Sequence, residues 1–290
     1  MRIYRIVKHF FSLIKFAHTI FAMPFAFAGF FWAWHESTRT GFPWKELCLV
    51  VLCMVFARNA AMGFNRYIDR KYDKKNPRTE NREIPAEIIS PNAALVFVIV
   101  NCALFCLTTK FINNLAFYLS FVALAVVLGY SYTKRFTALC HFVLGIGLSI
   151  APTGAYIALT GEFALFPVLL SVLVLFWVGG FDILYALPDY EFDKNHNLHS
   201  LPVAIGRKNA MLLSIAVHIV SILIALFIGF HFDRGLFYWT GCATFAGLLI
   251  YQHAIVSPTN LKRINAAFGL MNGIASVCFA VFSITDILVN

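Results

Sequence analysis

Long apolar stretches separated by short polar segments make up most of this chain. An α-helix needs about 20 apolar residues to cross the hydrocarbon core of a bilayer. Runs of that kind lie at 17–35, 46–64, 92–111, 113–132, 141–160, 164–182, 209–230, 235–256 and 265–287. The pattern predicts an all-α, polytopic membrane protein with a bundle of nine transmembrane helices. We expect residues 1–290 to form a single integral-membrane domain.

The first 16 residues, MRIYRIVKHFFSLIKF, mix basic and apolar side chains. Arg2, Arg5, Lys8 and Lys15 are interleaved with Ile, Val and Phe. This mixture is typical of an amphipathic helix that lies in the membrane interface.

Basic residues are distributed unevenly between the two sides of the predicted bundle. The N-terminus and the segments after the second, fourth, sixth and eighth runs hold 18 of the 23 Lys and Arg residues. The opposite segments hold four, and Arg58 lies inside a run. Positive residues mark the cytoplasmic side, so we expect a multi-pass protein of a bacterial inner membrane with a cytoplasmic N-terminus. The net charge of +9 then faces anionic lipid, and no nucleic-acid partner is expected.

The composition agrees with a membrane protein. Hydrophobic residues make up 60% of the chain and charged residues only 13%, whereas soluble domains are about half apolar and a quarter charged. The seven cysteines form no C-x-x-C pair. We interpret them as small packing residues rather than metal or redox sites.

Nine of the 14 acidic residues lie in two of the predicted cytoplasmic segments. Each segment contains three residues spaced by four, displaced from each other by 120 positions: Asn65, Asp69 and Asp73, then Tyr185, Asp189 and Asp193. Residues at this spacing share one face of a helix, and carboxylates near a bilayer need compensation. Any single Asp suits a solvated helix end, but two matched sets indicate Mg²⁺, which prefers oxygen ligands. Asp182, at the end of the sixth run, extends the second set.

Basic residues accompany these acids. Arg78 follows the first segment, and Lys134 lies in YSYTKRF after the fourth run. A metal held by carboxylates, together with Lys and Arg, suits a diphosphate, although anchoring at the cytoplasmic surface also explains basic residues there. Arg58 lies inside the second run, on nearly the same face as Asn65. A buried Arg in a span indicates a functional role, here a clamp for an anionic group such as an aromatic carboxylate; pairing with another polar group is the structural alternative.

The order of these motifs resembles the UbiA superfamily of intramembrane aromatic prenyltransferases. The pattern is R-x6-N-x3-D-x3-D with RTENR, then YSYTKRFT, then D-x2-Y-x3-D-x3-D, and the resemblance runs from HTIFAMPFAFAG to the ninth run. It implies a Mg²⁺-dependent transferase that joins a polyprenyl diphosphate to an aromatic acid, with no obligate protein partner. It implies metal binding by Asn65, Asp69, Asp73, Asp182, Asp189 and Asp193, and catalytic roles for Tyr185 and the four Asp residues of the two sets. Substrate binding falls on Arg58, Arg78, Lys134 and Asp182.

Two positions depart from the family pattern. Arg66 stands where relatives often carry Asp, and His199 precedes Ser200 where many relatives carry Lys. The His-Ser-x-Pro ending resembles the branch that prenylates a dihydroxynaphthoate for menaquinone. The acceptor is therefore either 4-hydroxybenzoate, for ubiquinone, or 1,4-dihydroxy-6-naphthoate. In both cases we expect electrophilic aromatic substitution.

Three rival interpretations use some of the same features. A transporter would also combine intramembrane acids with an internal repeat, but it predicts acids near the bilayer midplane. A phosphatidyltransferase would carry one, differently spaced Asp cluster. A haem or chlorophyll prenyltransferase of the same superfamily matches the motifs less well.

Overall fold

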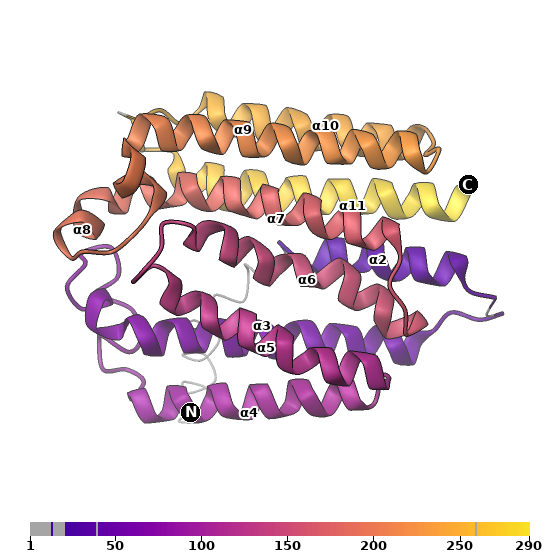
Figure 1. Cartoon of the computed structure of the whole chain (residues 1–290), viewed down its shortest axis with the longest axis horizontal. Coiled ribbons are helices and arrows are strands. Elements are labelled where there is room, and N and C mark those ends of the chain that lie inside the picture. The colour runs from indigo at the N-terminus through magenta and orange to yellow at the C-terminus, as the bar shows by residue number, and fades with distance from the viewer. Residues whose placement is uncertain (1–12, 14–20, 39, 259) are drawn as a thin grey trace, which may run out of the picture.

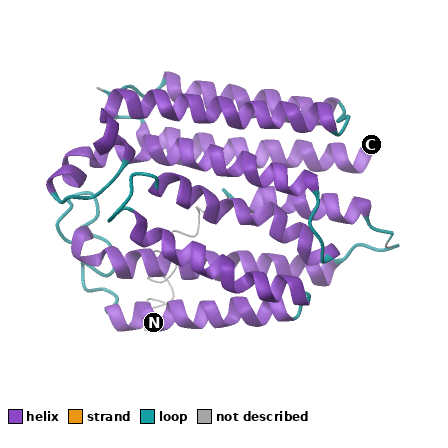
Figure 2. Cartoon of the chain, in the orientation of Figure 1, coloured by secondary structure: helices purple, strands orange, loops and turns teal. Residues whose placement is uncertain are grey.

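The computed structural model describes residue 13 and residues 21–38, 40–258 and 260–290, and over these it is helical, without a β-strand (Figures 1 and 2). The helices are α2 (Met23–Glu36), α3 (Trp44–Asp73), α4 (Pro91–Lys110), α5 (Asn114–Thr133), α6 (Cys140–Thr160), α7 (Leu165–Ala186), η2 (Leu187–Asp189), α8 (Tyr190–Asn195), α9 (Leu201–His231), α10 (Leu236–Ala254), η3 (Ala266–Met271) and α11 (Asn272–Val289). The predicted all-α class is confirmed. The predicted interfacial helix over residues 1–16 lies outside the described residues, apart from the buried Leu13.

The long helices run side by side, and successive helices point in opposite directions (Figure 1). As a result α3, α5 and α7 end at the same end of the bundle, on the left in Figure 1, where α8 also lies. The segments 74–90, 134–139 and 187–200 therefore gather at that end. This arrangement brings together the two acidic segments and the basic YSYTKRF segment.

Seven of the described helical segments are long and apolar enough to cross a membrane. The described part of α2 has 14 residues, and α10 has 19 residues but is not among the seven. Polar and aromatic side chains such as Thr240, Gln252 and His253 lower the mean hydropathy of α10. The structure therefore supports a multi-pass protein, and the count of nine crossings stays a prediction.

Local sequence explains where several helices begin and end. Ser90 accepts a hydrogen bond from the Ala93 amide and is followed by Pro91, which suits the first turn of α4. Asn113 caps α5 in the same way, through the Ala116 amide. Gly206, at φ 82°, kinks α9 near its start, in a backbone region that only Gly enters at little cost.

The core lies between α2, α6, α7, α9, α10 and α11, around the fully buried Trp177. Its indole nitrogen donates a hydrogen bond to Asn272 over 2.9 Å, which satisfies a polar group that would be costly to bury alone. α6 and α7 approach closely because Gly145 has no side chain: a Cβ there would lie 2.5 Å from the Leu175 carbonyl oxygen. This tightly packed half supports the end of α7, from which the second acidic segment emerges.

Candidate active site

The first acidic set lies on one continuous helix. α3 runs on to Asp73, past the predicted end of its span at residue 64. Asn65 donates to an Asp69 carboxylate oxygen over 3.1 Å, so these two share a face as their spacing predicts. Asp73 is buried at the last position of α3 and forms an ion pair of 2.7 Å with Arg82.

The second set does not lie on one continuous α-helix, which corrects the sequence-based interpretation. Tyr185 is in α7, Asp189 ends the 3₁₀ turn η2, and Asp193 is in the short helix α8. Pro188 explains the break, because it lacks the amide proton that would continue the helical ladder and its ring displaces the preceding turn. The chain tightens into η2 and restarts, so Asp189 and Asp193 are positioned by the turn as well as by helical spacing.

The segment after α3 connects the first set to the second. Arg78 forms an ion pair of 2.7 Å with Asp189, and Asn76 donates to the other oxygen of the same carboxylate over 3.2 Å. Asn76 also fixes the turn itself, since its side-chain oxygen accepts from the Arg78 amide at 3.0 Å. Residues that directly follow the first motif thus hold the second.

Two consecutive basic residues join the two sets a second time. Lys134, directly after α5, lies 2.8 Å from Asp193, whose side chain is fully buried. Arg135 lies 3.3 Å from Asp69 and also donates to the Ile68 carbonyl. The two sets are therefore within reach of one dipeptide, which makes them parts of a single site.

Electrostatics keep the Lys134 ammonium charged. Burial by itself lowers the pKa of Lys134, but the carboxylates of Asp193 and Asp189 outweigh this effect and raise the pKa above its ordinary value. Lys134 is thus a permanent cation beside both carboxylates of the second set.

Asp182 has a partner that the sequence did not reveal. Its carboxylate lies 2.7 Å from Nδ1 of the buried His141, whose Nε2 accepts a hydrogen bond from the Leu201 amide. His141 has no metal-ligand partner at helical spacing in its own helix. Its partner comes from a neighbouring helix instead.

A polar cavity of about 290 Å³ opens among the basic residues of this site. It is lined by Arg66, Arg78, Thr79, Asn81, Arg82, Glu83, Tyr185 and Asp189. Tyr185 stacks on Phe268 with 4.0 Å between ring centroids, and the Arg78 guanidinium lies 5.3 Å from the Tyr185 ring. Such contacts hold a flat cation in place over an aromatic face.

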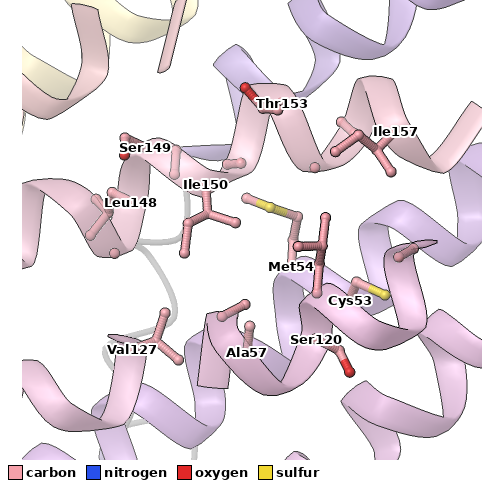
Figure 3. Close-up of a pocket in the computed structure, with 18 of the residues that line it drawn as sticks. Cys53, Met54, Ala57, Ser120, Val127, Leu148, Ser149, Ile150, Thr153 and Ile157 are labelled. Atoms are coloured by element: carbon pink, nitrogen blue, oxygen red, sulfur yellow. The ribbon is translucent and has the colours of Figure 1, made fainter. Parts of the chain in front are cut away.

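A larger cavity of about 480 Å³, mostly apolar, lies between α3, α5 and α6 (Figure 3). Figure 3 labels side chains from all three helices around it: Cys53, Met54, Ala57, Ser120, Val127, Leu148, Ser149, Ile150, Thr153 and Ile157. Arg58 and Tyr130 also line this cavity, and they interact electrostatically with each other. Arg58 forms no ion pair within the described residues, and its Nε is buried without a hydrogen-bond partner. Among the described residues, the structural alternative for Arg58, pairing with another polar group, is met by the neighbouring Tyr130 and not by an acid.

The carboxylates suit Mg²⁺ in chemistry, although the described residues include no three His, Cys, Asp or Glu side chains close enough to hold one metal ion. Mg²⁺ keeps several waters and is held by one or two carboxylates plus substrate phosphates, so such a cluster is not required. Asp73 and Asp193 each bury an Oδ2 that accepts no hydrogen bond among the described residues. Buried oxygens of this kind are suitable metal ligands.

Several residues of this site were not assigned a role from sequence. Arg82 and Arg135 stood in the quoted motifs RTENR and YSYTKRF, so their positions were visible. Asn76 offered no signal beyond following the first motif. His199 is exposed, and its backbone amide donates to the Lys134 carbonyl over 2.7 Å. His199 thus helps to position Lys134 through its main chain.

Comparison with known proteins identifies the family. Residues 22–274 match the model of the UbiA prenyltransferase family. The chain is 29% identical to a 4-hydroxybenzoate octaprenyltransferase of Aliivibrio salmonicida over 83% of this chain and 84% of the relative. It is 30% identical to one of Nitrosospira multiformis over 83% of each chain.

Solved structures agree with this match. A UbiA homolog from Aeropyrum pernix K1 superposes with a TM-score of 0.79 at 27% identity, over 94% of this chain and 97% of that chain. The fold of a UbiA homolog from Archaeoglobus fulgidus, solved bound to GPP and Mg²⁺, is also similar, with a TM-score of 0.71 at 20% identity over 97% and 99%. The multi-pass helical fold, the gathered acidic motifs and these matches agree: the chain is a prenyltransferase and belongs to the UbiA prenyltransferase family.

Proposed function

We propose that this protein transfers a polyprenyl group from a polyprenyl diphosphate to an aromatic hydroxy acid, either 4-hydroxybenzoate or 1,4-dihydroxy-6-naphthoate. The observation that carries the proposal is the dipeptide Lys134–Arg135, which contacts both acidic sets beside an apolar cavity. The relatives named 4-hydroxybenzoate octaprenyltransferase support the first acceptor. The His199–Ser200 sequence supports the second.

In this proposal the diphosphate lies at the polar end, between the two acidic sets. Asn65, Asp69, Asp73, Asp182, Asp189 and Asp193 supply the oxygen ligands for Mg²⁺, which when bound offsets the charge of the diphosphate and favours its departure. Arg78 and Lys134 contact the diphosphate oxygens directly. Each of the two is held by a carboxylate at 2.7–2.8 Å, so both are already oriented before the substrate binds.

The isoprenoid tail occupies the apolar cavity between α3, α5 and α6. Burying a chain of methyl and methylene groups there is favourable by about 0.8 kcal/mol per CH₂. The same lining excludes water from the allylic cation that forms when the C1–O bond breaks. Tyr185, fixed between Phe268 and Arg78, presents an aromatic ring at the polar end, where a ring face stabilises positive charge.

Arg58 holds the aromatic acid through its carboxylate. A guanidinium recognises a carboxylate with two parallel hydrogen bonds, and Arg58 lies in the cavity without an ion pair among the described residues. The ring carbon ortho to the phenolic hydroxyl then attacks C1 of the isoprenoid. A carboxylate of one acidic set accepts the ring proton, which restores aromaticity.

The site faces the cytoplasm in this proposal. The segments that carry it belong to the predicted side of the bundle that, together with the N-terminus, holds 18 of the 23 Lys and Arg residues, as the positive-inside rule requires for cytoplasmic segments. The bacterial relatives support the inner membrane as the location. Residues 1–290 then act as one integral-membrane domain.

One assay tests the proposed reaction. Membranes that contain the protein are incubated with Mg²⁺, a labelled polyprenyl diphosphate and one aromatic acid at a time. Labelled product with a single acid identifies the acceptor. Failure to form product with either acid would contradict the proposed acceptor class, provided that the protein is shown to be inserted and folded.

A further inference from the structure

Arg66 is the buried cation of this site that the proposed reaction does not use. Only 4% of it is exposed, and it lies in the last turns of α3, seven residues before Asp73. It lines the polar cavity together with Arg78, Arg82 and Asp189. We propose that Arg66 binds the diphosphate group of the isoprenoid substrate directly, as a third basic contact beside Arg78 and Lys134.

Arg66 lacks a counter-ion among the described residues. Arg66 forms no ion pair within the described residues, and its Nε is buried without a hydrogen-bond partner. The residues outside the described part include no Asp or Glu. Asp73 and Glu83 attract Arg66 only from beyond ion-pair distance, and Arg82 repels it. A charge buried without a partner is costly, so an anionic ligand is the compensation that the site needs.

The neighbouring cations of the polar cavity already have partners. Arg78 is paired with Asp189, and Arg82 is paired with Asp73. The guanidinium that contributes uncompensated positive charge to this cavity is therefore Arg66. A guanidinium with free donors matches two phosphate oxygens at once, which an ammonium does not.

The position of Arg66 in the motif also suits a phosphate contact. It directly follows Asn65 and precedes Asp69 by three residues, so it belongs to the helical turn that carries the first acidic set. An Arg at this position adds a direct phosphate contact where a carboxylate would contact a metal. The identity of the ligand as the diphosphate of the substrate rests on the proposed function. The need for an anion beside Arg66 does not.

The test compares Arg66→Met and Arg66→Lys with Arg70→Met. Arg70 lies one turn further along α3, outside the polar cavity, and donates to the Tyr67 carbonyl, so its variant controls for the loss of a guanidinium from this helix. Each protein is purified in detergent, and Tm is measured with and without inorganic pyrophosphate and Mg²⁺. Pyrophosphate binding and the KM values for both substrates complete the comparison.

We expect Arg66→Met to keep the Tm of the ligand-free protein, because it removes an unpaired buried charge. Its affinity for pyrophosphate and its KM for the prenyl diphosphate should worsen about 10- to 100-fold, the effect of losing a charged hydrogen bond. Its KM for the aromatic acid should stay within about twofold of the wild-type value. The pyrophosphate affinity of Arg66→Lys and its KM for the prenyl diphosphate should lie between those of the wild type and of Arg66→Met. Arg70→Met should match the wild type.

Three outcomes would overturn the inference. One is pyrophosphate affinity in Arg66→Met within twofold of the wild type. Another is a Tm of ligand-free Arg66→Met below that of the wild type, combined with an Arg66→Lys variant that recovers the wild-type Tm but not the affinity for pyrophosphate. That combination would indicate a structural role for Arg66. The third is a wild type that does not bind pyrophosphate at all. If pyrophosphate binds through Arg66 but neither aromatic acid is prenylated, the inference stands and the proposed acceptor class falls.

Discussion

The two basic residues that join the acidic sets should differ sharply in what they contribute to stability. Lys134→Met leaves the Asp193 carboxylate without its cation, and that side chain is 1% exposed. Arg135→Met frees Asp69, whose side chain is 28% exposed, from a looser pair of 3.3 Å. Burial therefore predicts a large decrease in the free energy of unfolding for Lys134→Met and a small decrease for Arg135→Met.

The magnitudes follow from the two environments. Removing one partner of a buried ion pair costs about 3–5 kcal/mol. The Lys134 side chain is itself 35% exposed, so water partly screens the pair and we expect about 3 kcal/mol. A partly exposed pair such as Arg135–Asp69 contributes about 0–1 kcal/mol. For a chain of this length, 1 kcal/mol shifts Tm by about 2 °C, which gives about 6 °C for Lys134→Met and at most about 2 °C for Arg135→Met.

Thermal unfolding in detergent, followed by the loss of monodisperse protein, measures both shifts. The pKa of Lys134 is raised, so its pairing stabilises the fold below the unfolded-state pKa of about 10.4 and is lost only as pH rises through the raised value. Burial already raises the pKa of Asp193, and Lys134→Met removes the cation that opposes this, so the Tm difference should shrink as pH falls and Asp193 takes up a proton. The double variant Lys134→Met/Asp193→Leu, which removes both charges, should recover most of the loss. Equal Tm shifts for the two single variants would refute the reasoning.

Three further predictions concern activity and topology. Asp69→Ala and Asp189→Ala should each abolish Mg²⁺-dependent transfer while the protein still inserts, and near-normal turnover in either variant would rule out the proposed metal ligands. Arg58→Ala should raise KM for the aromatic acid by about tenfold, the effect of one charged hydrogen bond, whereas an equal rise for the prenyl diphosphate would argue against the clamp. In a chain without its native cysteines, a membrane-impermeant thiol reagent added to intact cells should label Lys45→Cys but not Lys75→Cys, and the reverse pattern would invert the proposed orientation.

Helical periodicity and chemistry made the first acidic set predictable from sequence. Asn65 and Asp69 share a face because α3 continues through them, and spacing by four is enough to place them together. The same reasoning was wrong for the second set. Pro188 breaks the helix between Tyr185 and Asp189. Spacing by four places residues on one face only where the α-helix is continuous.

The sequence by itself determined the membrane-spanning character, the all-helical class, and the chemical types of the site residues, because each depends on local hydrophobicity or on the order of the motifs. Tertiary structure decided which acid meets which base. Lys134 lies 59 positions from Asp193, and His141 lies 41 positions from Asp182. These pairs form because antiparallel helices return the chain to the same end of the bundle. Contacts of that range depend on helix packing, which no local pattern encodes. Among the described residues, the same packing leaves Arg66 buried without a counter-ion.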